Sequence, residues 1–161
     1  MASERGAALA DDFAAANAEA IAFASGCSAD EWGTPVPGEN WSVGVVLHHI
    51  AEGHGQTSRW LQAMSNGQAV TDTAQDVDRA NAAHALRAGA VGPDETIVLL
   101  EVRGAELEAL LRRLDDEQLE RTAPFGPAGG QVFASVDLAP VAARHAREHL
   151  GHARDALRAQ D

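Results

Sequence analysis

The stretch WSVGVVLHHIAEGH, residues 41–54, has the pattern of the beginning of an amphipathic helix. Ser42 is a residue type that caps a helix, because its hydroxyl accepts a hydrogen bond from an otherwise unpaired amide of the first turn. Apolar residues then follow at helical spacing and form one stripe: Val46, Leu47 and Ile50. Val45 and His49, four residues apart, share a neighbouring face. We therefore expect a helix that continues to about Met64 and carries His49 beside its apolar stripe.

Helical patterns continue on both sides of this stretch, and strand patterns are nearly absent. The long helices are expected at residues 7–25, 41–64, 95–114 and 137–159, with a weaker helix at 72–88 and a short one at 115–120. Asp137 is expected to cap the last helix, which would put Pro140 in its first turn. This pattern predicts an all-α four-helix bundle with an extra short helix.

Two segments between these helices are expected to be loops. Residues 27–40, with two prolines and two glycines, are long for a helix hairpin, which indicates a crossover or a loop that shapes one end of the bundle. Residues 121–135 carry glycines and prolines near their middle and are expected to form an irregular connection.

Composition limits the classes of protein that fit this chain. Its 161 residues suit a single domain, which we expect to span 1–161. A formal net charge of −12 without a basic patch argues against binding to nucleic acid or to an anionic membrane. A single cysteine, Cys27, excludes an intrachain disulfide and fits a reducing compartment. We see neither a signal peptide nor an apolar run long enough to span a membrane, and we expect a cytoplasmic protein.

A second stretch, HAREHLGH at residues 145–152, holds three of the seven histidines. His145 and His149 are four residues apart, so both lie on one face of the last helix and can reach one ion. That face belongs to a stripe that would point into the bundle, where an imidazole needs a hydrogen-bond partner or a metal. His49 is the best candidate for a third ligand from another helix, and its alternative is a hydrogen-bonded core histidine.

Together the two stretches resemble the DinB/YfiT-like metalloenzyme superfamily, in particular the bacillithiol- and mycothiol-dependent transferases and the N-terminal domain of maleylpyruvate isomerases. In that family a Trp-Ser or Trp-Thr opens the second helix and a ligand histidine follows eight residues later, as from Trp41 to His49. The last helix carries two ligands four residues apart, then a small residue and Gln or His, as in HLGH. The resemblance implies that His49, His145 and His149 bind the metal, and that the whole chain is one bundle domain.

Other polar residues near these positions are weighed as rivals or neighbours of the ligands. Glu148 and His152, also four residues apart, form a rival pair, because some members of the family use a glutamate as a ligand. Glu52 and His54 follow His49 on its helix and could contact the site. His84 is expected at the surface.

The resemblance also implies a chemistry. The metal would be Zn²⁺ or Ni²⁺, with Fe²⁺ as a further option, and three imidazole ligands leave one of its coordination positions open. A low-molecular-weight thiol would bind there as its thiolate. It would then react in an S-transfer, a conjugation or an isomerisation. The lysine-free, arginine-rich composition suggests an actinobacterial source, and therefore mycothiol. Arg59, Arg144 and Arg147 are candidate donors to such a polar thiol. The alternatives are a metal-dependent hydrolase and a non-enzymatic metal-binding bundle. The oligomeric state is left open, although members of the family that the chain resembles often form homodimers.

Overall fold

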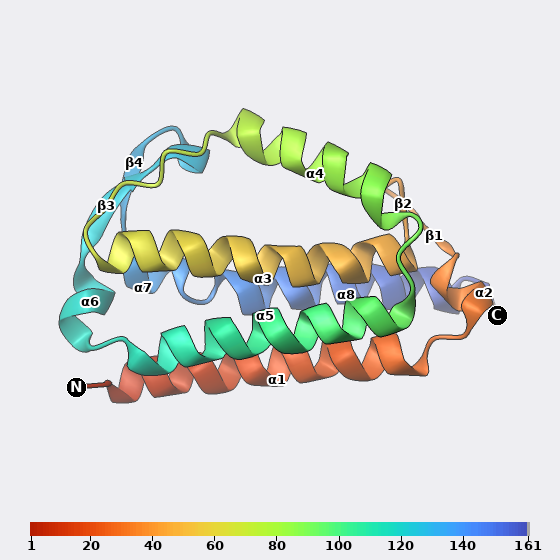
Figure 1. The fold of residues 1–161 in the computed structure, drawn as a ribbon, viewed down its shortest axis with the longest axis horizontal. Helices are drawn as coiled ribbons and strands as arrows, with labels where there is room; N and C mark the ends of the chain where they lie inside the picture. The colour runs from red at the N-terminus through yellow and green to blue at the C-terminus, as the bar shows by residue number, and fades with distance from the viewer. Residues whose placement is uncertain (161) are drawn as a thin grey trace.

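Four long helices form the body of the molecule in the computed structural model, which describes residues 1–160 (Figure 1). They are α1 (Glu4–Gly26), α3 (Val43–Ser65), α5 (Pro93–Arg113) and α8 (Val141–Arg158). Helices α1 and α3 each pack against α5 and α8. The predicted all-α four-helix bundle is confirmed. No helix in this part of the chain is both long and apolar enough to cross a membrane.

The crossover of the bundle lies between its second and third long helices. After α3 the chain returns through α4 (Ala74–Ala88), so α3 and α5 run in the same direction, opposite to α1 and α8 (Figure 1). The segment after α1 holds a short helix, α2 (Ala29–Trp32), and two antiparallel strands, β1 (Pro35–Val36) and β2 (Trp41–Ser42). Of the two alternatives for residues 27–40, the structure has the loop that shapes one end of the bundle.

Two local expectations were wrong. Residues 121–135 contain an antiparallel hairpin of β3 (Thr122–Phe125) and β4 (Gln131–Ala134), joined by a 3₁₀ turn, η1 (Gly126–Ala128), and two glycines with φ near +70° and +81°. Val70 contributes a bridge to Phe125 from outside this hairpin, a long-range contact that no local pattern reveals.

The second wrong expectation was a continuous last helix over residues 137–159. A short helix, α7 (Ser135–Leu138), ends before Pro140, and α8 begins at Val141. Asp137 accepts a hydrogen bond from the backbone N–H of Ala134 at 3.0 Å, so its carboxylate caps α7 and not α8.

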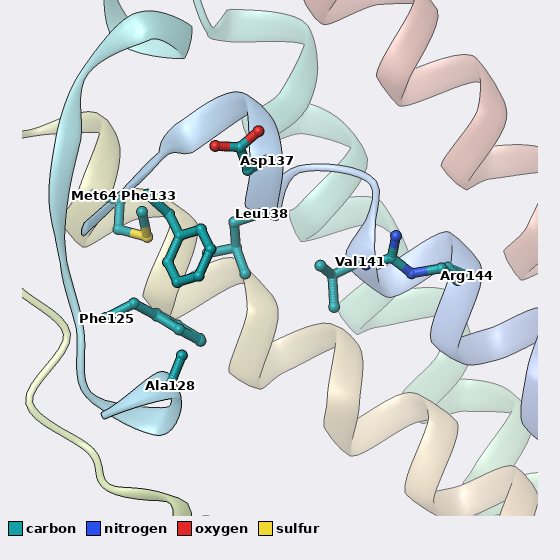
Figure 2. Close-up of a pocket in the computed structure, with 8 residues that line it drawn as sticks. All are labelled: Met64, Phe125, Ala128, Phe133, Asp137, Leu138, Val141 and Arg144. Atoms are coloured by element: carbon teal, nitrogen blue, oxygen red, sulfur yellow. The ribbon is translucent and has the colours of Figure 1, made fainter. Parts of the chain in front are cut away.

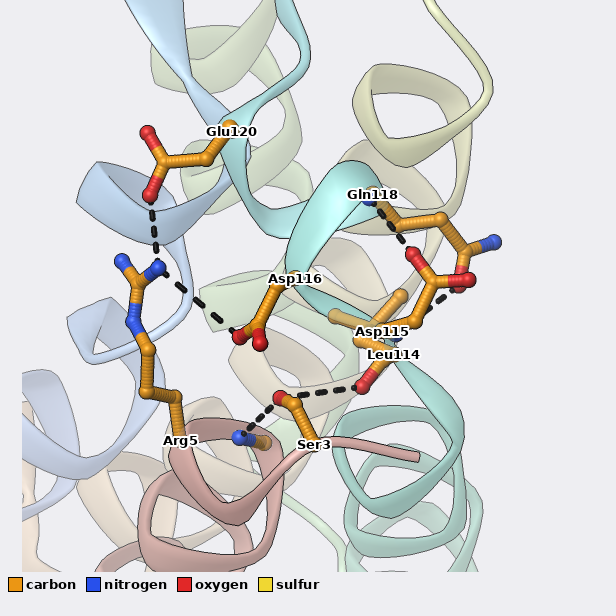
Figure 3. Close-up of polar contacts among 8 residues, drawn as sticks. Ser3, Arg5, Leu114, Asp115, Asp116, Gln118 and Glu120 are labelled. Carbon is orange, nitrogen blue, oxygen red and sulfur yellow. Dashed lines mark hydrogen bonds and ion pairs between the residues drawn. The ribbon is translucent and has the colours of Figure 1, made fainter. Parts of the chain in front are cut away.

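A polar contact ties the beginning of α1 to the end of α5 and to α6 (Asp116–Glu120), as Figure 3 shows. The Ser3 hydroxyl accepts a hydrogen bond from Gly6 N at 3.0 Å and donates one to the Leu114 carbonyl at 3.3 Å. The Arg5 guanidinium reaches Glu120 at 2.6 Å. These contacts satisfy the first turn of α1 and fix this end of the bundle.

The core is mostly leucine and alanine, but it contains one buried polar link between three helices. Asn17 of α1 donates its amide to the Leu100 carbonyl of α5 at 3.1 Å, and its oxygen lies 3.0 Å from Nε2 of His54 on α3. A Cβ at Gly104 would lie 2.1 Å from this amide, so the glycine makes room for it. His54, 0% exposed, is therefore a hydrogen-bonded core histidine, and it belongs to neither group of potential metal ligands within residues 1–160.

Candidate metal centre

Three imidazoles meet between α3 and α8. His49 comes from α3, and His145 and His149 come from successive turns of α8. The Nε2 atoms of His49 and His145 lie 3.0 Å apart, and the three ring centroids are 4.4–4.9 Å from one another. One nitrogen from each of the three rings lies within 4.8 Å of those of the other two. We call these three residues the histidine cluster.

The donor set of the histidine cluster fits a divalent transition metal. Two nitrogens bound at about 2.0–2.1 Å to a tetrahedral ion lie roughly 3.3 Å apart, close to the separation of the His49 and His145 nitrogens. Imidazole suits Zn²⁺, Ni²⁺ and Fe²⁺, and three protein ligands leave a position for another group. Metal binding by these residues stays a prediction, and the geometry is compatible with it.

The environment keeps His49 and His145 neutral, which is the form of imidazole that binds a metal. Burial, together with the nearby imidazoles of His145 and His149, lowers the pKa of His49 to about 3. Burial, followed by the nearby His149 ring, lowers the pKa of His145 to about 4. Both rings therefore offer an unprotonated nitrogen at neutral pH.

A glycine on α3 makes room for the ring of His145. Gly53 lies one turn after His49, and a Cβ at this position would be 2.8 Å from Cε1 of His145. The absence of a side chain at residue 53 therefore lets the α8 imidazole lie directly against α3.

Glu39, for which no local sequence pattern predicts a role in the site, orients His149 within the histidine cluster. Both of its carboxylate oxygens lie 2.9 Å from Nδ1 of His149, and Oε1 also contacts Nδ1 of His152. The carboxylate is 10% exposed. A carboxylate that accepts from Nδ1–H leaves the lone pair on Nε2 of His149, which is the usual arrangement behind a metal-binding histidine.

The tight turn between β1 and β2 presents this carboxylate. Gly38 and Asn40, on either side of Glu39, have φ of +85° and +58°. These are residue types that tolerate the left-handed region, so the sequence PGEN carries a signal for the turn. It carries no signal for the partner on α8, which is 110 residues away in the chain.

A pocket of about 360 Å³ opens beside the histidine cluster, between α3, α4 and α8. Trp41 forms one wall, and its ring centroid lies 4.8 Å from that of His49. Asn81 of α4 and Val141 of α8 also line it. Any ion held by the cluster would thus face a space large enough for part of a small molecule.

A family model described as the DinB superfamily matches residues 12–153. The chain belongs to the DinB superfamily. The matched range includes both histidine-bearing stretches, so the resemblance expected from those stretches is confirmed. No curated protein matches the sequence.

The fold of this DinB-superfamily chain is similar to that of YfiT from Bacillus subtilis, which is described as "a probable metal-dependent hydrolase with an unusual four-helix bundle topology". The two structures superpose with a TM-score of 0.79 at 18% sequence identity, over 99% of this chain and 90% of that one. At this identity the likeness establishes the shared fold.

The other predicted site residues, His152, Glu148 and Glu52, lie in three different environments. His152 joins Glu39 and His149 in a second group that could hold a metal, within residues 1–160. Glu148, its predicted partner, is exposed and belongs to neither group of potential ligands in this range. Glu52 is exposed and lines a neighbouring polar pocket together with His49.

The expectation that His84 lies at the surface was wrong. Its ring is 4% exposed, and its Nε2 lies 2.7 Å from Nδ1 of His48 on the neighbouring helix. Trp41 packs on its edge at 5.9 Å between centroids. The helical pattern of α4 is weakly amphipathic, and only its contact with α3 identifies the face that is buried.

Two further residues, Arg147 and Cys27, lie outside both groups of potential metal ligands within residues 1–160. Arg147 binds Asp12 of α1 at 2.8 Å, so it lies on the outer face of α8 and not at the pocket. Burial, together with the charge of Glu31, raises the pKa of the Cys27 thiol to about 11. That thiol is protonated at neutral pH and is poorly suited to act as a nucleophile.

Proposed function

We propose that this protein is a metal-dependent enzyme whose metal is held by His49, His145 and His149. The single observation that carries the proposal is the convergence of three imidazoles, from two helices, beside an open pocket. A structural ion would be enclosed by a fourth protein ligand, whereas a catalytic ion keeps a position open to a substrate. No fourth ligand joins these three within residues 1–160.

The chemistry that we propose is the activation of a low-molecular-weight thiol, with mycothiol as the first candidate. A bound ion at this site would supply a Lewis acid that keeps the thiol sulfur deprotonated. The carbon–sulfur bond would then form as the leaving group departs with its electron pair, and the thiol proton would pass to solvent. The chain itself offers Cys27, whose raised pKa argues against it as the nucleophile, so a borrowed thiol suits this site.

A polar pocket next to the cluster supports a thiol that carries carboxylate or hydroxyl groups. Arg59 and Arg87 line it together with Gln56 and Asn81, and His49 forms part of the same wall. Neither arginine takes part in an ion pair within residues 1–160, although the chain has 24 acidic residues against 12 basic ones. These guanidinium groups are free to bind an anionic part of a ligand.

The first test is metal binding. The purified wild type is expected to contain about one divalent ion per chain after metal-replete growth, and His49→Ala should weaken metal affinity more than ~100-fold, because it removes a ligand. His48→Ala, which changes the adjacent histidine on α3, is the control and should keep the ion. Measurement by elemental analysis and competitive chelation decides the matter; a wild type that binds no transition metal refutes the proposal.

The second test is thiol transfer. The metal-loaded protein is expected to accelerate the reaction of mycothiol with monochlorobimane, in which a carbon–sulfur bond forms and chloride leaves. The measurement is fluorescence of the conjugate, with His49→Ala as the inactive control. If the protein accelerates the reaction with neither mycothiol nor bacillithiol, the hypothesis of thiol activation is refuted.

Hydrolysis is the second candidate, because a protein of the same fold, YfiT, is described as a probable metal-dependent hydrolase. In that case water would occupy the open position in place of a thiol. Turnover of ester or amide substrates by the metal-loaded protein without any thiol would favour this candidate. A protein that binds metal but performs neither reaction would fit the non-enzymatic alternative.

A further inference from the structure

An apolar cavity of about 200 Å³ lies at the end of the bundle where the β3–β4 hairpin folds back over α3 and α8 (Figure 2). Its apolar lining consists of Met64, Phe125, Ala128, Phe133, Leu138 and Val141. The two phenylalanine rings pack edge to face at 6.1 Å between centroids and remain only half-buried. Ring surface is thus left facing this cavity, although burying it would be favourable.

The wall formed by the hairpin is held firmly in place. The Val70 amide donates to the Pro124 carbonyl at 2.9 Å, and the Gly126 amide donates to the Val70 carbonyl at 2.8 Å. A Cβ at Gly126 would lie 2.2 Å from the Asp72 carbonyl oxygen, so only glycine allows this close approach. The cavity is therefore bounded by a fixed wall, as a binding pocket is, and not by a loosely attached loop.

The apolar cavity adjoins the pocket of the histidine cluster. Val141 lines both spaces, one turn before His145 on α8. On the opposite side Trp60, which lines the cluster's pocket, packs against Phe125 of the cavity at 5.1 Å between centroids. A molecule with its reacting atom at the cluster could extend past Val141 and place another group among these rings.

Size and charge indicate what this group is. A cavity of about 150 Å³ lined by aliphatic and aromatic side chains is known to accept benzene, so this one is large enough for a single ring or a branched alkyl group. Asp137 and Arg144 also line the cavity, one of each sign, so their charges select neither an anion nor a cation. The Asp137 carboxylate is in addition engaged by the Ala134 amide.

We propose that this cavity is a substrate subsite that binds an uncharged aryl or branched alkyl group. The role of this cavity as the subsite for the electrophile rests on the proposed function. Its ability to bind an apolar group does not depend on that function. The polar pocket lined by Arg59 and Arg87 would then bind the polar thiol. This apolar cavity would bind the apolar group of the electrophile.

Direct binding of benzyl alcohol tests the pocket without reference to catalysis. The wild type is expected to bind this probe saturably in ligand-observed NMR, with nuclear Overhauser effects from the ring to the methyl groups of Val141 and Leu138. Ala128→Phe, which fills the cavity, should weaken binding at least tenfold. Val132→Phe, on the same hairpin but 63% exposed and outside the cavity lining, should bind as the wild type does.

The variants must also keep the fold and the metal. Equal metal content and thermal unfolding midpoints in Ala128→Phe and Val132→Phe would show that the loss of binding is local. Absence of saturable binding to the wild type, or equal binding to both variants, overturns the proposal. If Ala128→Phe does not fold, Val141→Leu offers a smaller change at the boundary of the two spaces, and unaltered probe affinity in that variant likewise overturns it.

A kinetic comparison then relates the pocket to the proposed function. With a thiol and the metal-loaded enzyme, Ala128→Phe should lower kcat/KM for benzyl bromide at least tenfold and leave that for iodoacetamide, which has no apolar group, unchanged. Equal effects on both electrophiles contradict the subsite. If neither electrophile reacts but benzyl alcohol still binds, the thiol-transfer function fails and the pocket remains.

Discussion

Glu39 is the residue on which the placement of the outer histidines depends. It contacts Nδ1 of both His149 and His152 and is nearly buried, although it is the single residue between two positions with left-handed backbone, Gly38 and Asn40. A carboxylate in this place fixes the tautomer and the orientation of the His149 ring. Glu148 lies next to His149 in sequence but is exposed, so proximity along the chain is a poor guide here.

Replacement of these two glutamates distinguishes their roles. Glu39→Ala is expected to weaken metal affinity 10–100-fold, because His149 loses the acceptor that orients it. Glu148→Ala is the matched control and should leave affinity within about twofold of wild type. Competition with a chromophoric chelator and the Co²⁺ absorption spectrum provide the measurement. Weaker binding in Glu148→Ala than in Glu39→Ala would instead support the rival pair of Glu148 and His152.

At the scale of elements, two glycines in helices α3 and α8 have opposite surroundings. A Cβ at Gly53 would meet the ring of His145 at 2.8 Å, whereas a Cβ at Gly151 would have nothing within 4 Å. Alanine is favoured over glycine in a helix interior by about 1 kcal/mol. Replacement of glycine by alanine at residue 151 therefore tests helix stability alone, whereas the same replacement at residue 53 also changes the geometry of the histidine cluster.

Gly151→Ala is expected to stabilise the protein by about 0.5–1 kcal/mol without an effect on metal binding. Gly53→Ala should weaken metal affinity at least tenfold, because the His145 ring must move away from α3. Chemical denaturation and chelator competition on both variants are the measurements. Unchanged metal affinity in Gly53→Ala would show that His145 does not need its present position.

Helical periodicity and capping residues predicted the long helices correctly, but they did not predict the β3–β4 hairpin or the short helix α7. The stripe in residues 41–54 and the capping serine define α3, and Ser42 does accept a hydrogen bond from Val45 N at 3.3 Å. The β3–β4 hairpin was missed because its alternation is short and its third partner, Val70, lies far away in sequence. The break at Pro140 was missed because Asp137 fits a cap of either α7 or α8 until its partner is known.

At the scale of the whole molecule, histidines buried outside the cluster make stability depend on pH. Burial lowers the pKa of His54 to about 3 and that of His84 to about 4. In the unfolded chain each would titrate near 6.5, so below that pH the unfolded state binds more protons than the folded state. Stability is thus retained at neutral pH and is lost as the pH falls below about 6.5.

The metal-free protein is expected to lose about 1.2 kcal/mol of unfolding free energy for each such histidine between pH 6 and pH 5. Urea unfolding at several pH values measures the slope. His54→Gln, whose side-chain amide can still donate to Asn17, removes one titrating group and should reduce the slope by that amount. Equal slopes for the two proteins would contradict a folded-state pKa for His54 well below 6.5.

Local patterns in the sequence define the class of fold, the long helices and the pair His145 and His149, because helical period and capping are local and because a spacing of four places two imidazoles on one face. The way in which these helices meet follows from their packing against one another. This packing brought His49 within 3.0 Å of His145, selected Glu39 over Glu148 as the carboxylate beside His149, and buried His54 and His84. These relations depend on contacts between residues that are distant in the chain, and such contacts form only when several helices pack at once.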